Sequence, residues 1–196
     1  MSELFLDEDE SNTPLTREES EQLIPSYITL RAELNHAEHT NIANAMQWLG
    51  VARNLNLLDE SSLKEIHKKM FCDVWRWAGS YRTTARNIGI EAYLIPTAIR
   101  QLIDDVKYWI EHGTYPPDEI AIRYSHRLVK IHPFPNGNGR FSRLLGDLLA
   151  EQLGQAKFTW GRNNLINPET TRRDYINALR AADGGDIQAL LQFAKS

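Results

Sequence analysis

The sequence has little of what marks a secreted or membrane-bound protein. Among its 196 residues there is a single cysteine, Cys72, which cannot form an internal disulfide and is typical of a reducing compartment. No apolar run approaches the roughly 18–20 residues that cross a bilayer, and the first residues are acidic, unlike a basic signal peptide. The composition therefore predicts a cytoplasmic protein with no membrane partner.

The chain also lacks an excess of basic over acidic residues. The chain has 22 Lys and Arg against 26 Asp and Glu, a formal net charge of −4. Eight of the carboxylates lie within residues 1–21, where Arg17 is the one base, so the rest of the chain is mildly basic. We expect no direct nucleic-acid binding, although a phosphate ligand or a protein partner is not excluded. Residues 1–25 are predicted to form an acidic, flexible leader, followed by one domain over residues 26–196.

Apolar residues recur at helical spacing along most of this domain. Residues 80–95 interrupt the pattern, because Thr83, Thr84, Ile88 and Ile90 favour extended structure and Gly89 suits a turn. The sequence therefore predicts an all-α fold of six to eight helices with one short β-hairpin, a flap over residues 82–95. The expected helices cover residues 26–54, 62–78, 97–111, 117–131, about 141–153, 168–182 and 186–194.

The chemistry is concentrated in residues 132–143, where a histidine precedes a Gly-Asn-Gly turn and two arginines. Gly137 and Gly139 let a ligand approach the backbone, whose successive N–H groups can surround an anion at the start of a helix. Arg140 and Arg143 are three residues apart on one helix face, and each guanidinium suits two phosphate oxygens. His132 beside this cradle can accept a proton from a hydroxyl. The segment predicts transfer of a phosphorus-centred group to a hydroxyl.

Each part of this segment also has a simpler interpretation. A single histidine at a helix end is more often a packed or capping residue, and a Gly-Asn-Gly turn is more often only a turn. Two arginines at this spacing usually form a solvated surface. The combination within twelve residues favours the phosphate site over these separate structural roles.

The run His-Pro-Phe-Pro-Asn-Gly-Asn-Gly-Arg-Phe-Ser-Arg, residues 132–143, resembles the signature of the Fic domain family (Fic/Doc). Residues 71–82 are similar to the family's segment that leads into its substrate flap, and the resemblance extends over residues 26–195. The leader and residues 30–42 look most like the group called mobile mystery protein B. That resemblance implies a bacterial source and a small helix-turn-helix protein as a partner.

The family resemblance implies a protein adenylyltransferase, a nucleotidyltransferase that moves AMP from ATP, with Mg²⁺ or Mn²⁺, to a Ser, Thr or Tyr hydroxyl of a target protein. On this resemblance His132 is the catalytic base and Phe134 is the buried anchor of the loop. The target would dock along the 82–95 flap by strand addition. The resemblance assigns the nucleotide phosphates to Gly137, Asn138, Gly139, Arg140 and Arg143.

Asn136 departs from the family pattern, which has Asp or Glu at this position as a ligand of Mg²⁺. An amide oxygen carries no charge and should hold the ion less tightly, so Asn136 is a weak candidate metal ligand. The alternative function is therefore a nucleotide-binding regulatory or partner-binding module with little catalysis, and transfer of another phosphorus-linked group is a third option.

Residues 29–34 partly match an inhibitory helix found in many Fic proteins, with Glu33 as its glutamate. A carboxylate paired with Arg143 would occupy the position of the γ-phosphate and prevent productive ATP binding. The predicted helix over residues 26–54 is then inhibitory. Alternatively, Glu33 is an exposed helix residue without this role.

Overall fold

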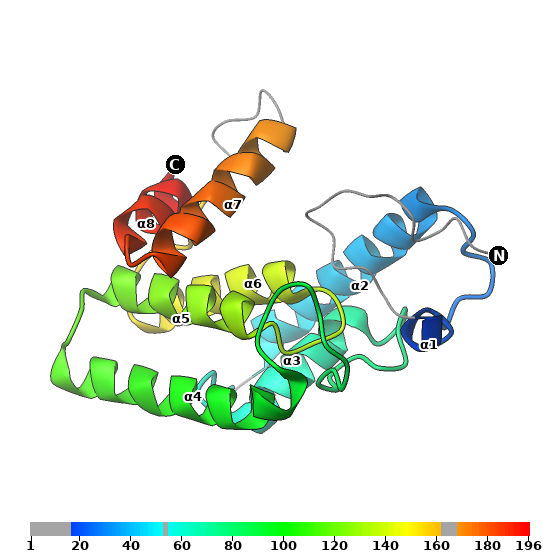
Figure 1. Ribbon diagram of the computed structural model, residues 1–196, viewed down its shortest axis with the longest axis horizontal. Coiled ribbons are helices and arrows are strands. Elements are labelled where there is room, and N and C mark those ends of the chain that lie inside the picture. Colours follow the sequence, from blue (N-terminus) through cyan, green and yellow to red (C-terminus); the bar gives the residue numbers. More distant parts are fainter. Residues whose placement is uncertain (1–16, 53–54, 162–167) are drawn as a thin grey trace. The chain divides into compact units, whose positions relative to one another are not determined.

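The protein consists of two compact, mainly helical units. The computed structural model describes residues 17–52, 55–161 and 168–196. One unit contains the described residues up to Arg100 together with Ile131–Phe141, and the other contains Gln101–Lys130 and Ser142–Ser196. Helices α4 (Ile95–His112) and α6 (Asn138–Gln152) contribute residues to both units. Figure 1 shows helices connected by loops, and no strand occurs in the described ranges, so the all-α prediction is confirmed.

The first unit is built around α2 (Arg31–Val51) and α3 (Glu60–Phe71), which pack side by side in Figure 1. The short helix α1 (Arg17–Ser20) and the 3-10 turn η1 (Ala92–Leu94) belong to the same unit. Apolar side chains spaced three and four residues apart give α3 one buried face. The buried apolar residues of this face are Leu63, Ile66, Met70 and Phe71.

The ends of α3 differ from the sequence prediction. The helix begins before the predicted residue 62, with Asp59 as the N-cap, whose carboxylate accepts from the Ser62 N–H at 3.1 Å. The helix ends at Phe71, well before the predicted stop near Gly79. At this end the Asn41 amide of α2 donates to the Lys69 carbonyl at 3.0 Å and satisfies a group at the helix C-terminus.

Part of the predicted leader lies against the first unit by backbone hydrogen bonds. Residues 1–16 are outside the described ranges. Beyond α1, the Ile24 N–H donates to the Val74 carbonyl at 2.8 Å, and the Arg76 N–H donates to the Gln22 carbonyl at 3.1 Å. Residues 22–24 of the predicted leader are thus paired with residues 74–76.

The predicted hairpin over residues 82–95 is wrong. Residues 80–91 form an irregular loop without a strand, and η1 follows it. The carbonyls of Thr84 and Ile90 accept from the Arg82 guanidinium rather than from N–H groups of a facing strand. Gly89, at φ +91°, also leaves the extended region. A buried side chain organises this loop in place of a β-ladder.

The second unit contains the remaining turns of α4 and α6, α5 (Pro117–Ile131) up to Lys130, α7 (Pro168–Asp183) and α8 (Ile187–Lys195). Helix α7 packs along α8, as Figure 1 shows. Proline suits the first turn of α5 and α7, where its missing N–H leaves no hydrogen bond unmade. The core of this unit includes Leu102, Val106, Ala121, Ile122, Tyr124, Leu145 and Leu190.

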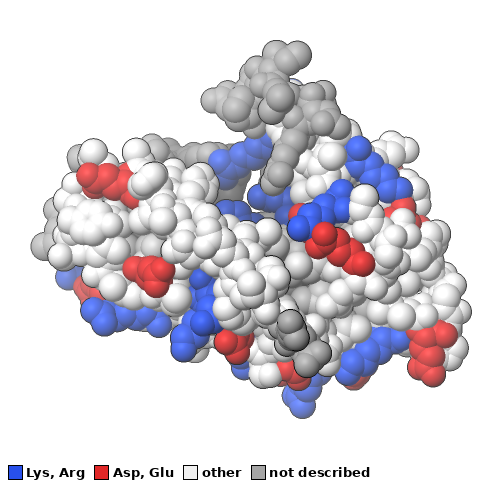
Figure 2. Space-filling view, turned by 180° about the vertical axis from the view of Figure 1, so that it is seen from behind, with Lys and Arg blue, Asp and Glu red and all other residues white. Residues whose placement is uncertain are grey.

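Figure 2 shows Lys and Arg as well as Asp and Glu side chains in separate groups on a face that consists mostly of other residues. None of the helices in the described ranges has the length and apolar character that a membrane span requires.

Candidate functional site

The loop that joins α5 to α6 carries His132 in a strained backbone conformation. His132 has φ +55°, although it is not glycine, and its side chain and backbone are almost fully buried, with 5% exposed. A non-glycine residue in this region costs about 1–2 kcal/mol. Such a conformation persists only where the surroundings impose it, and it is frequent at functional sites.

Phe134 anchors this loop in the core of the first unit. Its exposure is 0%, and its ring stacks on the imidazole of His67, with centroids 3.6 Å apart. The Gly79 N–H donates to Nδ1 of His67 at 3.1 Å, so Nε2 carries the proton and donates to the Asn136 carbonyl at 3.1 Å. Burial lowers the pKa of His67 to about 3. His67 is therefore a neutral hydrogen-bonding support beneath residues 134–136.

The Asn138 side chain closes the loop on itself. Its Oδ1 accepts from the Phe134 N–H at 2.9 Å, and its Nδ2 donates to the Phe134 carbonyl at 2.8 Å. Asn138 is 2% exposed and is also the first residue of α6. The amide thus shapes the loop at the start of α6, and the first N–H groups and the dipole of a helix favour negative charge at such an end.

Gly137 lies directly against the ring of Phe71. It has φ +79°, and a Cβ at this position would come within 2.4 Å of the ring. Only glycine therefore fits here without displacing Phe71. The Gly137 N–H, one of the predicted phosphate donors, is occupied by Oδ1 of Asn136 at 2.6 Å.

The residues present fit a divalent cation poorly. The Asn136 amide oxygen is uncharged and already accepts from Gly137, whereas Mg²⁺ favours charged oxygen ligands. Within the described ranges, no three His, Cys, Asp or Glu side chains come together as a metal-binding group. An ion at this loop would depend mainly on oxygens brought by a nucleotide.

Arg140 pairs with a buried carboxylate that the sequence did not reveal. Its Nη2 lies 2.7 Å from Oε2 of Glu38 on α2, and the Glu38 side chain is 5% exposed. The other oxygen of Glu38 accepts from Nε1 of Trp75 at 2.7 Å. The Arg140 guanidinium also lies over the Phe71 ring, 5.0 Å from its centroid. The first motif arginine is thus held by an acid and an aromatic ring.

Arg143 lies on the same helix, α6, three residues beyond Arg140, and belongs to the second unit. Its guanidinium is 4.9 Å from the centroid of the Tyr175 ring of α7. This contact is a cation–π interaction, in which the ring face attracts the positive charge of the arginine.

Glu33 makes its hydrogen bonds at the start of α2. Its carboxylate accepts from the backbone N–H of Thr29 at 2.8 Å and of Leu30 at 3.0 Å. The hydrogen bond from the Thr29 N–H is the main reason why the pKa of Glu33 lies below its usual range. Glu33 therefore caps the N-terminus of α2, and Glu38 is the α2 carboxylate that reaches a motif arginine.

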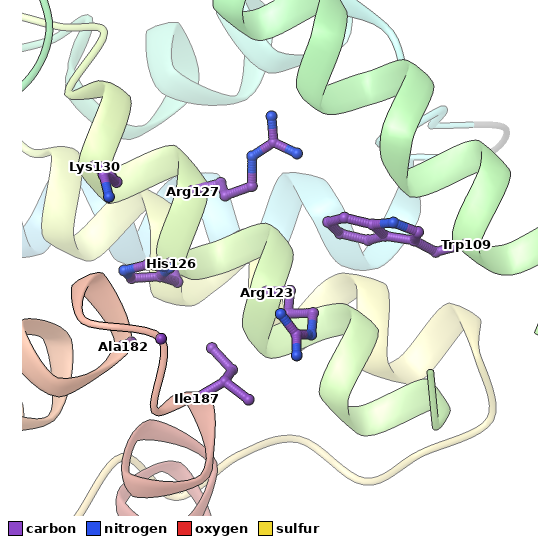
Figure 3. A pocket seen from close by; sticks show the side chains of 8 residues that line it. Trp109, Arg123, His126, Arg127, Lys130, Ala182 and Ile187 are labelled. Carbon is purple, nitrogen blue, oxygen red and sulfur yellow. The ribbon is translucent and has the colours of Figure 1, made fainter. Parts of the chain in front are cut away.

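A separate pocket of about 340 Å³ lies within the second unit. In Figure 3, Trp109 of α4 stands on one side of α5 and Ile187 of α8 on the other. The basic residues that line the pocket lie along α5 and are Arg123, His126, Arg127 and Lys130.

Each of these basic side chains has an acidic partner within the second unit. His126 and Lys130 share Asp183, at 3.0 and 3.1 Å. The two arginines pair with Glu119 and with Asp105. An anionic ligand would have to compete with these carboxylates, so the pocket is a weaker candidate than the 132–140 loop.

Three supporting residues of the first unit were not predicted from the sequence. They are His67, Arg82 and Glu38, and each acts on the 132–140 loop from a distant part of the chain. Arg82 ends the run Trp-Arg-Trp-Ala-Gly-Ser-Tyr-Arg. Its position at the end of this run was the one feature of the sequence that could have indicated its supporting role. Polar residues on a helix give no indication by themselves of which partner they reach.

Together these features define an all-α protein with a buried histidine before a glycine-containing turn at a helix N-terminus. The profile of the Fic/DOC family matches residues 57–150, which include α3, the 80–91 loop and the 132–143 segment. This part of the chain belongs to the Fic/DOC family.

Curated relatives support the same assignment. "Protein adenylyltransferase fic-1" of Caenorhabditis elegans is 30% identical over 119 residues, which cover 59% of this chain and 22% of the relative. "Protein adenylyltransferase Fic" of Drosophila grimshawi is 30% identical over 165 residues, which cover 81% of this chain and 32% of the relative. The chain therefore spans about a fifth to a third of the length of these relatives.

Solved structures share the fold. The N-terminal Fic domain of Bep8 from Bartonella sp. 1-1C has a TM-score of 0.68 at 17% identity, covering 87% of this chain and 88% of that one. BepC from Bartonella tribocorum, solved with bound AMPPNP, has a TM-score of 0.65 at 20% identity. The match covers 92% of this chain and 97% of BepC. At these identities the similarity establishes the fold alone.

Proposed function

We propose that this chain is a protein adenylyltransferase that transfers AMP from ATP to a hydroxyl side chain of a target protein. Its relatives from C. elegans and D. grimshawi carry that name, and a neighbour in fold was solved with an ATP analogue. The transfer joins the target oxygen to the α-phosphorus and breaks the bond to the β-phosphate oxygen, so pyrophosphate leaves. His132 takes the proton of the hydroxyl.

The position of His132 carries this proposal. A buried histidine in an imposed conformation directly precedes a turn whose N–H groups and helix dipole attract phosphate. Phosphoryl-type transfer depends mainly on positioning and charge stabilisation, which a rigid loop provides. In this role Gly137, Gly139 and Arg140 contact the nucleotide phosphates, and Arg143 contacts the terminal phosphate.

Intact-mass analysis tests the proposal. The full chain is incubated with ATP and either Mg²⁺ or Mn²⁺, alone and with a bacterial extract depleted of nucleotides. We expect an adduct with the mass of one AMP group that is absent from His132→Ala. An adduct of phosphate mass, or an AMP adduct that His132→Ala retains, would contradict the proposal.

The second candidate is a nucleotide-binding regulatory module with little catalysis, and Asn136 favours it. Its amide oxygen occupies the Gly137 N–H and brings no charge for a metal ion. Binding of ATP by calorimetry without an adduct on any protein would support this function over transfer.

We also propose that α2 restrains the site through Glu38. The Glu38 carboxylate takes up the Arg140 guanidinium at 2.7 Å, so a nucleotide phosphate must displace it. Because the Glu38 side chain is almost fully buried, the carboxylate and the phosphate compete for the arginine with little screening by water. The protein would then be autoinhibited by Glu38 rather than by Glu33.

Two conservative variants separate these glutamates. Glu38→Gln keeps an acceptor for Trp75 but removes the charge, and we expect ATP to bind about tenfold more tightly. Glu33→Gln is the matched control, because it alters the cap of α2 and leaves Arg140 paired. Equal ATP affinity in the wild type and Glu38→Gln would contradict the restraint, and a gain in Glu33→Gln would restore the original assignment.

Further proposals rest on the family resemblance. The target offers a Ser, Thr or Tyr hydroxyl and docks along the 82–95 segment, and the nucleotide carries Mg²⁺ or Mn²⁺. A small helix-turn-helix protein is a partner, the source is bacterial, and the single cysteine supports a cytoplasmic location.

A further inference from the structure

The guanidinium of Arg82 is buried and bonds to several backbone carbonyls. Arg82 is 2% exposed. Its Nε donates to the His132 carbonyl at 2.6 Å, and its Nη1 donates to the Thr84 carbonyl at 2.9 Å. Its Nη2 donates to the carbonyl of Ile90 and lies 3.4 Å from that of Ile131. One side chain thus connects segments that are about fifty residues apart in the sequence.

These carbonyls belong to two functional segments. Thr84 and Ile90 lie at the two ends of the 84–90 loop, whereas Ile131 and His132 lead into the candidate catalytic loop. The backbone adds to the connection, because the Arg82 N–H donates to the Pro133 carbonyl at 3.0 Å. Arg82 therefore fixes the residues on either side of the His132 peptide.

The 84–90 loop also touches His132 directly. A Cβ placed on Gly89 would lie 2.5 Å from the His132 Cβ and 3.1 Å from the Ile131 carbonyl oxygen. The backbone of Gly89 consequently packs against the face of His132 with no room for a side chain. Any movement of this loop moves the surface on which His132 rests.

The chemistry of arginine suits this connection. A guanidinium is planar and presents five donors in a fixed fork, so the carbonyls that it binds are held in a defined relation. Lysine offers a point charge on a flexible stem and cannot reproduce the fork. The unusual φ of His132 requires surroundings that impose it, and Arg82 supplies hydrogen bonds on both sides of that residue.

We propose that Arg82 is a positioning residue that couples the 84–90 loop to His132, so that the loop and the base adopt their working geometry together. The loop would present the target hydroxyl, and Arg82 would set its relation to His132. The catalytic part of this inference rests on the proposed AMP transfer, whereas the coupling itself does not.

Hydrogen–deuterium exchange of the full chain tests the coupling without any reaction. In Arg82→Lys we expect exchange to rise about tenfold both in peptides that cover residues 84–91 and in peptides that cover residues 131–136. Both segments lose their hydrogen bonds to the Arg82 guanidinium in this variant. Arg86→Lys is the matched control within the loop. Arg86 donates to the Thr84 hydroxyl at 2.8 Å and to the Ala85 carbonyl at 3.2 Å, so peptides covering 131–136 should stay protected.

Kinetics of self-modification with ATP test the positioning. We expect Arg82→Lys to lower kcat about 100-fold with KM for ATP changed less than about threefold, because the phosphate-binding turn has its own supports in His67 and Phe71. Arg100→Lys, an exposed arginine that donates to the Pro96 carbonyl on its own helix, should retain the wild-type rate.

Several outcomes would overturn the coupling. Exchange that rises in one segment alone, or equal loss of protection in Arg86→Lys, would show that the two segments are independent. Wild-type kcat in Arg82→Lys would exclude a positioning role for the fork. If the wild type forms no AMP adduct, the proposed function fails, while the exchange experiment still decides whether Arg82 couples the two segments.

Discussion

At the scale of single residues, Gly137 is a sterically constrained position in the turn between α5 and α6. Two separate effects oppose a side chain here, namely φ +79° and the Phe71 ring, which lies 2.4 Å from the place that a Cβ would take. We expect Gly137→Ala to lower the free energy of unfolding by about 2–4 kcal/mol, from backbone strain plus steric overlap. Denaturant unfolding followed by circular dichroism measures this loss.

Gly154 provides a matched control for that substitution. It has nearly the same backbone angle, φ +78°, but a Cβ there meets no atom within 4 Å. Gly154→Ala should therefore lose only the strain contribution, about 1–2 kcal/mol. Equal losses in the two variants would mean that the Phe71 contact contributes nothing to the stability of the turn.

Asn136 is the residue at which a charge would change the chemistry. In Asn136→Asp a carboxylate replaces the amide oxygen beside the Gly137 N–H and becomes a suitable ligand for Mg²⁺. We expect the Mg²⁺ concentration for half-maximal AMP transfer to fall about tenfold, measured by the rate of adduct formation across a Mg²⁺ series. An unchanged Mg²⁺ dependence would show that residue 136 does not contact the ion.

At the scale of helices and loops, local signals account for most element boundaries. Pro117 begins α5, which ends at Ile131, and these are the predicted limits. Where a boundary depends on a distant residue, the prediction is wrong. At the end of α3 a carbonyl accepts from Asn41 of α2, and the loop after residue 80 is organised by the Arg82 guanidinium rather than by β-propensity. These contacts exist only in the folded chain.

The link between α5 and α7 gives the second unit a predictable response to acid. His126 lies 3.0 Å from Asp183, and burial lowers the pKa of His126 below its usual 6.5, against the opposing effect of Asp183. Lys130 and Arg123 also face this histidine and lower its pKa further. As the pH falls below 6.5, the unfolded chain binds a proton that folded His126 resists, so stability decreases.

The measurement compares denaturation midpoints at about pH 7.5 and about pH 5. His126→Gln keeps a donor near Asp183 but does not titrate, so its midpoint should fall less than that of the wild type over this range. Burial raises the pKa of Asp183, but the hydrogen bonds from Lys130 and His126 outweigh this effect, so that the pKa lies below its usual range. Asp183 therefore stays ionised between these two pH values. A larger fall in His126→Gln would reverse the expected sign.

At the scale of the whole molecule, the candidate site divides into what the sequence reveals and what it does not. His132, Phe134 and residues 136–140 are contiguous, so their chemistry is visible in one segment. Their supports come from elsewhere in the chain. The sequence offered Glu33 as the α2 carboxylate that meets a motif arginine, whereas Glu38 is the one that pairs with Arg140, because helical periodicity alone does not tell which glutamate reaches it.

The distribution of charge along the whole chain leads to the last prediction. Residues 1–16 contain five carboxylates and no Lys or Arg, and the chain carries a net charge of −4. Removing these residues makes the remainder slightly positive, which favours the approach of a nucleotide with several negative charges. We expect the association rate of ATP to rise roughly two- to fivefold at low ionic strength, and the difference to disappear at about 0.5 M salt, where screening is strong. Stopped-flow measurements with a fluorescent ATP analogue at both salt concentrations provide the test. A rate increase that persists unchanged in high salt would assign the effect to direct obstruction of the site rather than to charge.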